Sequence, residues 1–407
     1  MKNLLVAQSG GPTSAINATL AGVIENALSS PSVDKIYGSV NGIQGVLNEN
    51  LIDLKTKITN VSELDLLCQT PASALGSCRV KLKDPAVCAD EYETIISVLR
   101  KYSIDCFIYI GGNDSMDTVD KLSKYLNDKG ITDITVVGAP KTIDNDLCGT
   151  DHCPGFGSAA KYIGTTFAEL ERDCHVYTTK AVTIVEVMGR DAGWLTAASV
   201  LARKHELDNP LLIYLPESDF DLQEFSRDLT NALHKQPNVV VCVSEGISDA
   251  GGRFICEYNT DATALDTFGH KMLAGCGKVL ENYVRSTFGV KARSVELNVS
   301  QRCSGMIASL TDIEEAAHAG AIGVSNALNG ATGMMVSMKR GSGSPYRLEY
   351  VLEDVNEICN KEKKFPLSWI TNHGTDIGPE FQAYAIPLIQ GEPARVMDHG
   401  LPVYLHR

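Results

Sequence analysis

The sequence predicts an α/β protein whose sheets are mainly parallel and whose length suits two domains. Strand-like apolar runs alternate with helix-like periods along the chain, which is typical of a parallel sheet with helices packed on it. The chain has 407 residues, more than one compact core usually holds. Glycine-rich and acidic motifs follow several of the strand-like runs, at the strand ends where such sheets bind ligands.

The strand-like runs are short and rich in β-branched or apolar residues. The run 4–7 is followed by a glycine turn and an amphipathic stretch at 14–28, and the run 106–110 is followed in the same way by 115–126. Other runs of this kind lie at 135–138, 181–187, 211–215 and 239–243. The chain contains no repeat, low-complexity segment or long linker, so the motif positions alone set the expected domain borders.

The composition is that of a globular protein without an extended basic face. Hydrophobic residues make up 44% and charged residues 21% of the chain, and the net charge is −14. Nucleic-acid-binding faces are basic, so no nucleic acid is expected as a partner. No apolar stretch reaches the roughly 20 residues that cross a bilayer. Residues 1–8 run straight into a Gly-Gly-Pro turn, which favours a first strand over a signal peptide.

The twelve cysteines are scattered and form no Cys-x-x-Cys pair. Cys148 and Cys153 are the closest two and have His152 between them, but no second pair completes a zinc site. Reduced cysteines in a cytoplasmic enzyme are therefore expected.

Two glycine pairs follow strand-like runs and are candidate phosphate sites. Gly10-Gly11 follows the first run, and Gly111-Gly112 leads into Asn113-Asp114-Ser115. Paired glycines let backbone N–H groups approach a phosphate, and a helix N-terminus favours negative charge. A tight strand–helix turn is the alternative for either pair. Asp114 adds a carboxylate of the kind Mg²⁺ prefers, unless it or Ser115 only caps the helix.

The segment 140–146 carries the densest chemistry. Asp144 and Asp146 flank an asparagine just after a strand. Two such carboxylates can divide the labour, one accepting a hydroxyl proton and the other organising metal or base. Lys141 supplies a positive charge for phosphate oxygens. A solvated turn also favours Asn and Asp, but it does not need Lys141 and Thr142, so function is the preferred interpretation.

A strand-end acid and several arginines complete the candidates. Arg190 ends the segment Val187-Met188-Gly189-Arg190 and can grip a phosphate or sugar oxygen in fork geometry. Glu245 follows the run 239–243 and can accept hydrogen bonds from sugar hydroxyls. For Arg190 and Glu245 a salt bridge at a domain interface is the alternative. The remaining candidate cations are Arg79, Arg293 and Arg302.

Common nucleotide-site designs are not supported. There is no Gly-x-x-x-x-Gly-Lys-[Ser/Thr] motif, and Gly275-Cys276-Gly277-Lys278 lacks both the spacing and the hydroxyl after the lysine. No protein-kinase catalytic-loop signature occurs. The segment 155–160 nearly matches a dinucleotide fingerprint, but a turn precedes it instead of a strand. A dinucleotide-dependent oxidoreductase is therefore a distant alternative.

The order of these motifs resembles the phosphofructokinase family. The matching segments run in family order and are 9–11, 75–79, 111–115, 142–146, 185–190, Glu245 and 301–302. The resemblance implies two Rossmann-like α/β domains with the active site in the cleft between them. It implies a donor-binding domain at 1–150 plus about 303–355, and a sugar-phosphate-binding domain at about 151–302 plus 356–407. The chain beyond about residue 310 suggests no chemistry.

The resemblance also implies the role of each candidate residue. Asp144 would take the proton from the C1 hydroxyl of fructose 6-phosphate, with help from Asp146. Gly11 and Arg79 would hold the phosphoryl donor. Arg293 would reach the sugar phosphate in a neighbouring subunit's site, which implies a homodimer or a tetramer. The residues that would hold fructose 6-phosphate are Thr142, Met188, Gly189, Arg190, Glu245 and Arg302.

Two positions favour pyrophosphate over ATP as the donor. ATP-using members resemble one another in carrying Gly at the places of Asp114 and Lys141, which leaves room for the α-phosphate and ribose. Charged side chains here would fill that room and could pair with each other. Many ATP-using members carry an adenine-stacking Tyr near the place of Ile43. The resemblance therefore implies the pyrophosphate-dependent branch, with Asp114 and Lys141 taking part in the reaction.

Three departures from the family pattern bear on the site. Asn113 stands where many members have Asp, so of the implied Mg²⁺ ligands Asn113 and Asp114 the first can bind metal directly, through water or not at all. Val299 replaces a His near the sugar, and Ala181 replaces a second cross-subunit Arg, which leaves a seven-carbon ketose phosphate open as a substrate. The alternatives are an ATP-dependent 6-phosphofructokinase and a non-catalytic regulatory paralogue.

Overall fold

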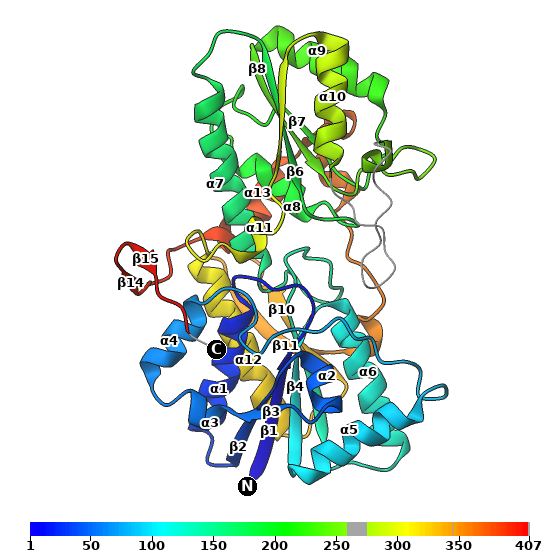
Figure 1. The fold of residues 1–407 in the computed structure, drawn as a ribbon, viewed down its shortest axis with the longest axis vertical. Helices are drawn as coiled ribbons and strands as arrows, with labels where there is room; N and C mark the ends of the chain where they lie inside the picture. Colours follow the sequence, from blue (N-terminus) through cyan, green and yellow to red (C-terminus); the bar gives the residue numbers. More distant parts are fainter. Residues whose placement is uncertain (259–274, 344, 406–407) are drawn as a thin grey trace. The chain divides into compact units, whose positions relative to one another are not determined.

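A computed structural model describes residues 1–258, 275–343 and 345–405 of the chain (Figure 1). The chain divides into two compact units. Unit 1 comprises Met1–Ser158, Arg302–Glu362 and Gln390–Arg407, and unit 2 comprises Ala159–Gln301 and Lys363–Ile389.

Three short segments lie in a different unit from the one expected. Residues 151–158, 356–362 and 390–407 were expected in the second domain but belong to unit 1. The last of them is held there by contacts that form only in the folded chain. Leu405 packs against a core cluster of unit 1, and the Gln69 side chain exchanges hydrogen bonds with the backbone of Val396, at 3.2 and 2.8 Å. Motif positions along the sequence carry no record of such contacts.

Unit 1 is built on one seven-stranded sheet. From edge to edge its strands are β11 (Leu348–Asp354), β10 (Met334–Arg340), β5 (Thr135–Pro140), β4 (Ile104–Gly111), β1 (Lys2–Gln8), β2 (Val33–Ser39) and β3 (Leu51–Asp53). The five inner strands run parallel, and the two edge strands pair antiparallel to their neighbours. Because the inner strands are parallel, their carboxyl ends meet at one edge of the sheet.

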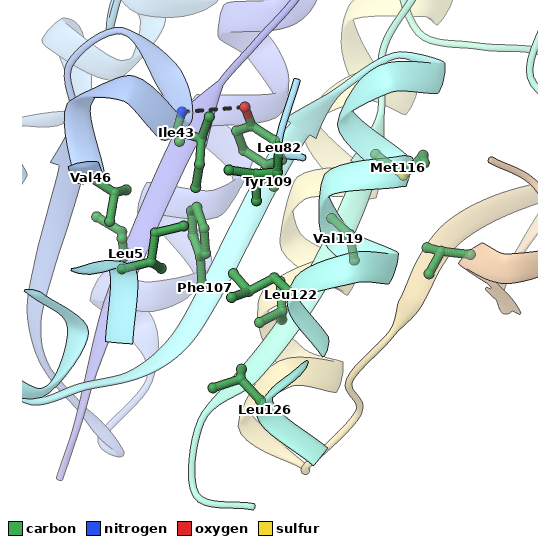
Figure 2. Packing of buried hydrophobic residues seen from close by; sticks show 14 of the residues in the cluster. Leu5, Ile43, Val46, Leu82, Phe107, Tyr109, Met116, Val119, Leu122 and Leu126 are labelled. Atoms are coloured by element: carbon green, nitrogen blue, oxygen red, sulfur yellow. Dashed lines mark hydrogen bonds between the residues drawn. The ribbon is translucent and has the colours of Figure 1, made fainter. Parts of the chain in front are cut away.

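Helices cover both faces of this sheet (Figure 1). One face packs against α1 (Ile16–Ser29), α3 (Leu54–Lys57), α4 (Val61–Gln69) and α12 (Leu310–Leu328). The other packs against α2 (Gly42–Leu47), α5 (Ala89–Lys101) and α6 (Asn113–Asp128), as Figure 2 shows from close by. Alternate residues of β1 serve the two cores, Leu4 and Val6 on one face and Leu5 and Ala7 on the other.

Unit 2 has a smaller, all-parallel sheet of β7 (Leu212–Tyr214), β8 (Asn238–Ser244), β6 (Ala181–Val187) and β9 (Lys291–Glu296), in that order. The helices α9 (Leu222–Lys235) and α10 (Cys276–Phe288) pack on it around one core cluster. The other helices with residues in unit 2 are α7 (Phe156–Cys174), α8 (Trp194–Ala197), α11 (Ser300–Cys303) and α13 (Pro379–Ala385).

Short elements complete the description. They are the 3₁₀ turns η1 (Ala198–Ala202), η2 (Ile255–Tyr258), η3 (Val355–Glu357), η4 (Leu367–Trp369), η5 (Asn372–Gly374) and η6 (Ile386–Ile389), and the two-residue strands β12 (Ile370–Thr371), β13 (Asp376–Ile377), β14 (Met397–Asp398) and β15 (Leu401–Pro402). The predicted fold class is confirmed, and each strand-like run named from the sequence contains or lies within a strand. Within the described residues, no helix is long and apolar enough to cross a membrane.

Candidate active site

In unit 1 the first glycine turn, a lysine and an arginine lie together. Lys141 Nζ donates a hydrogen bond to the carbonyl oxygen of Gly11 at 2.6 Å. A Cβ added at Gly10, whose φ is +78°, would lie 3.1 Å from the same ammonium, and one added at Gly11 would lie 3.5 Å from Arg302 Nη1. The turn after β1 therefore leaves room for two cations at its backbone, which is the arrangement an anionic ligand needs.

Lys141 is a buried cation at the end of β5. Only 2% of its surface is exposed. Burial lowers the pKa of Lys141 to about 8, because the charged ammonium loses its hydration. The negative charges of Asp144 and Asp146 act in the opposite direction and raise this pKa, and the Arg302 guanidinium lowers it. A bound anion would therefore stabilise the charged form of Lys141.

The two acids after β5 lie on a loop that is folded back on itself. The backbone N–H of Asp144 donates to Thr142 Oγ1 at 3.1 Å. Asn145, at φ 57°, accepts a hydrogen bond from the backbone of Cys153 on its side-chain oxygen, at 3.0 Å. Asn145 is fully buried, whereas Asp144 and Asp146 on either side of it are partly exposed. The loop thus presents both carboxylates from a fixed backbone.

Asp114 does not pair with Lys141, contrary to the expectation that they could pair. Asp114 lies in the first turn of α6, where its Oδ1 is 3.1 Å from Lys81 Nζ. Both side chains of that pair are about half exposed, at 47% and 60%. The ammonium of Lys141 instead donates a hydrogen bond to the carbonyl oxygen of Gly11. Neither Asp114 nor Ser115 caps α6, because the N-cap residue is Gly112.

Asn113 is engaged by the backbone in a way that the metal-ligand prediction did not anticipate. Its Nδ2 donates to the carbonyl oxygen of Lys361 at 2.6 Å, and its Oδ1 accepts from the backbone N–H of Asn360 at 2.5 Å. Among the residues that the structure describes, no group of three or more His, Cys, Asp or Glu side chains is placed to hold a metal ion. Asp114 is therefore the better metal candidate of the two predicted ligands.

Arg79 lies on a loop that runs beside the first glycine turn. Ser77 Oγ donates to the carbonyl oxygen of Gly10 at 2.6 Å, and Gly10 N donates to the carbonyl oxygen of Cys78 at 3.4 Å. The Arg79 side chain itself is exposed. Unit 1 therefore brings the loop of Arg79 together with Gly11, Lys141 and Arg302.

In unit 2 the predicted sugar-binding loop is held by hydrogen bonds from its backbone to two side chains. The backbone N–H of Gly189 donates to Glu245 Oε1 at 3.3 Å, and that of Met188 donates to Gln301 Oε1 at 3.3 Å. Gly189 has φ +125°, and a Cβ there would lie 2.7 Å from the Ala192 carbonyl oxygen. A Cβ at Gly246 would come within 1.9 Å of the carbonyl oxygen of Arg190. Gly246, which sequence reasoning did not select, is thus required for the loop.

Arg293 stands apart from that loop within unit 2. It pairs in register with Thr183, near the start of β6, whereas Met188 follows the end of β6. The offset of five positions between Thr183 and Met188 corresponds to about 16 Å of strand. Arg293 lies 3.7 Å from Asp173 and, with Lys291 among others, lines a cavity of about 300 Å³.

The predicted dinucleotide and zinc alternatives lose their support. The backbone N–H groups of Gly155 and Ser158 at the start of α7 both donate to the carboxylate of Asp312, at 2.9 Å each, so this helix start already holds an anion. His152 is buried and bonds Asp151 and Glu315, at 2.8 and 2.7 Å, not a cysteine. None of the twelve cysteines, all of which lie in the described residues, forms a disulfide.

Comparison with known proteins identifies the family to which this chain belongs. The family profile described as Phosphofructokinase matches residues 3–296. The chain belongs to the phosphofructokinase family, so the predicted family is confirmed.

Individual relatives and a solved structure are named as pyrophosphate-dependent enzymes. A pyrophosphate–fructose 6-phosphate 1-phosphotransferase of Methylococcus capsulatus is 40% identical over 99% of this chain and 95% of its own length. The enzyme of the same name from Rhodospirillum rubrum is 36% identical over 99% of both chains. The crystal structure of a pyrophosphate-dependent phosphofructokinase from Marinobacter aquaeolei, 38% identical, matches with a TM-score of 0.87 over 100% of this chain and 96% of that one.

Proposed function

We propose that the protein transfers a phosphoryl group from pyrophosphate to the C1 hydroxyl of fructose 6-phosphate, giving fructose 1,6-bisphosphate and orthophosphate. The observation that carries this proposal is the buried ammonium of Lys141 against the Gly11 turn, with the carboxylate of Asp114 at the start of α6. Charged residues stand at the two places where ATP-using members of the family carry Gly. The names of full-length relatives support the same donor.

The chemistry asks the protein for position and charge more than for covalent bonds. The oxygen of the C1 hydroxyl attacks one phosphorus of pyrophosphate, and its proton passes to the carboxylate of Asp144. The bond from that phosphorus to the bridging oxygen breaks, and orthophosphate leaves beside Lys141. Asp146 supports Asp144 from two residues away. Because a phosphoanhydride is exchanged for a phosphate ester with little loss of free energy, the reaction is expected to run in both directions.

The residues present fit a magnesium ion that is held mainly by the substrate. Mg²⁺ usually binds proteins through one or two carboxylates and keeps water and substrate phosphate oxygens as its other ligands. The exposed carboxylate of Asp114 meets that need without a cluster of acids. When bound, the ion would neutralise charge on the pyrophosphate, and Lys141 would share that task.

The surroundings of Ile43 argue against an adenine site at its position. Ile43 is fully buried and packs in the same core cluster as Phe107 and Tyr109. Its backbone N–H donates to Tyr109 Oη at 3.3 Å, as the dashed line in Figure 2 marks. A side chain that faces the core cannot stack on a base. This observation favours pyrophosphate over the ATP-dependent alternative.

A comparison of donors tests the proposal. Purified protein is assayed for fructose 1,6-bisphosphate formation with pyrophosphate or with ATP, each at saturating Mg²⁺ and fructose 6-phosphate. We expect turnover with pyrophosphate and little with ATP. Efficient turnover with ATP alone would support the ATP-dependent alternative, and no turnover with either donor would support a non-catalytic regulatory paralogue.

A double variant tests the steric part of the argument. Replacing Asp114 and Lys141 together by Gly should weaken the use of pyrophosphate by removing the cation, and it should open room for a nucleotide. The Thr118→Ala variant serves as a control, because it removes a buried hydroxyl on the same helix that donates to the carbonyl oxygen of Asp114 at 3.1 Å and leaves both charges in place. If the double variant prefers pyrophosphate as strongly as the parent, the steric argument is wrong.

The assembly is proposed to be at least a homodimer. The position of Arg293, five residues of strand away from the loop of Arg190, suits a residue that serves the sugar phosphate of a neighbouring subunit. In that arrangement Arg293→Ala should raise the KM for fructose 6-phosphate, and a mixture with a second inactive variant that keeps Arg293 should regain activity. The twelve cysteines form no disulfide, which supports the proposal of a cytoplasmic enzyme.

A further inference from the structure

A short strap of chain, residues 360–365, leaves unit 1 and enters unit 2. The border between the units falls inside it, after Glu362. Its first half, Asn360 to Glu362, is held by unit 1, and its second half, Lys363 to Phe365, is held by unit 2. Each half is anchored beside residues that the proposed function uses.

In unit 1 the strap is hydrogen-bonded to the start of α6 and to the loop after β5 that carries Asp144 and Asp146. Asn113 holds the backbone of Asn360 and Lys361 through both atoms of its amide, at 2.5 and 2.6 Å. The Asn360 side chain donates to Asp117 Oδ1 on the next turn of α6, at 2.9 Å. Glu362 then forms an isolated antiparallel bridge with Leu147. Asn113 precedes Asp114, and Leu147 follows Asp146.

In unit 2 the strap is tied to the loop that follows Arg190. Lys364 Nζ donates to the carbonyl oxygen of Asp191 at 2.6 Å, and Trp194 Nε1 donates to the carbonyl oxygen of Lys363 at 3.0 Å. The backbone N–H of Phe365 donates to Glu217 Oε1 at 2.9 Å, and the ring of Phe365 lies 5.1 Å from that of Trp194. Asp191 directly follows Arg190.

We propose that Asn113 is a positioning residue for fructose 6-phosphate, acting through this strap, and not a ligand of the magnesium ion. The inference rests on the proposed function for the identity of the substrates. The amide of Asn113 already bonds one donor and one acceptor of the strap backbone, and an ionised carboxylate at this position could not donate to the acceptor. Along the chain, Asn360 and Lys361, the strap residues held by Asn113, lie only four and three residues before Lys364, which donates to the carbonyl oxygen of Asp191.

Two substitutions at one position separate the two roles. Asn113→Ala removes both hydrogen bonds, and Asn113→Asp keeps the acceptor for Asn360 but sets a carboxylate against the carbonyl oxygen of Lys361. If Asn113 positions the strap, both variants should raise the KM for fructose 6-phosphate by roughly 5- to 20-fold, the size expected for the loss of one or two such bonds. The Mg²⁺ activation constant should change less than about twofold. If Asn113 binds the metal, N113D should tighten Mg²⁺ and keep the KM for the sugar, which would overturn the proposal.

A double-mutant cycle tests whether the effect runs through the strap. Trp194→Phe keeps the aromatic packing but removes the donor to Lys363 at the other end. Each single variant loosens the same strap, so the double variant N113A/W194F should cost little more than the larger single effect. Effects that multiply would mean that the two residues act independently and would sink the proposal. Asn356→Ala is the matched control, because Asn356 precedes the strap and its exposed side chain bonds Lys124, at 2.8 Å, and its neighbour Glu357.

A direct measurement of substrate binding separates the test of the strap from the test of the proposed activity. The affinity for fructose 6-phosphate is measured by calorimetry on the folded parent and variants, with thermal unfolding recorded for each. An absence of turnover with pyrophosphate in the parent would refute the proposed donor alone. A variant N113A that melts with the parent and binds fructose 6-phosphate equally well would refute the strap alone.

Discussion

The candidate residues of unit 1 and those of unit 2 are held in place by different physical means. In unit 1 the candidate site depends on charge: the pKa of a buried ammonium responds to two partly exposed carboxylates and to an arginine. In unit 2 it depends on backbone shape, because Gly189 has a positive φ and Gly246 lies against the backbone of Arg190. Charge changes in unit 1 should therefore act on the chemical step and the donor, and shape changes in unit 2 should act on sugar binding.

The strongest test of this contrast is Asp144→Ser. Removing a general base that acts in the transition state should lower kcat by about a thousandfold, with little change in the KM for fructose 6-phosphate. Steady-state kinetics with pyrophosphate in excess measure both constants. Asp146→Asn is expected to have a smaller effect on kcat. An Asp144→Ser enzyme with normal kcat would remove Asp144 from the mechanism.

The pH dependence of donor binding tests the charge on Lys141. Because its pKa is lowered to about 8, the free enzyme loses this cation as the pH rises above that value. The KM for pyrophosphate should then rise by up to about tenfold per pH unit. Lys141→Arg, which stays charged, should lack this rise, whatever its absolute KM. A KM that is flat from pH 7 to 9.5 in the parent would contradict the assignment.

The lowered pKa of Lys141 also predicts how the stability of the protein changes with pH. A lowered pKa means that the folded state binds this proton less tightly than the unfolded state, whose ordinary value is 10.5. The free energy of unfolding should therefore gain a contribution as the pH rises from about 8 towards 10.5, and Lys141→Met should remove that contribution. Denaturant unfolding of both proteins across this range measures the difference.

A shape change in unit 2 should act mainly on sugar binding. Gly189→Ala places a Cβ 2.7 Å from the Ala192 carbonyl oxygen at a φ of +125°. The strain should cost about 1–3 kcal/mol of stability and raise the KM for fructose 6-phosphate by roughly tenfold. The KM for pyrophosphate should stay within about twofold if the candidate residues of unit 2 serve only the sugar. Gly252→Ala, at positive φ but in open space, is the control for strain without a nearby contact.

The smallest effect is expected at Lys81. Its ion pair with Asp114 is about half exposed on both sides, and such pairs contribute roughly 0–1 kcal/mol. Lys81→Ala should therefore change the KM for pyrophosphate by less than about fivefold. The measurement is a pyrophosphate titration at low and high salt, since the effect should shrink as salt screens the pair. A large, salt-independent effect would make Lys81 part of the donor site.

The sequence was most informative where chemistry and local structure coincide. The strand-like runs at 4–7, 106–110 and 181–187 carry period-two or continuous apolar patterns that only a sheet covered by helices satisfies. The strands β2, β3, β9, β10 and β11 were missed, because their residues are mixed in polarity and they are placed by their neighbours in the sheets.

By itself, the sequence determined the family, the parallel α/β fold and the set of candidate residues, because those follow from residue types at short spacings. Only the tertiary structure decided what each side chain touches. It paired Asp114 with Lys81, turned Lys141 to the Gly11 carbonyl, and committed the amide of Asn113 to a strap 247 residues further along the chain. Such partners are far apart in sequence, and their contacts depend on how the elements pack, which no local pattern records.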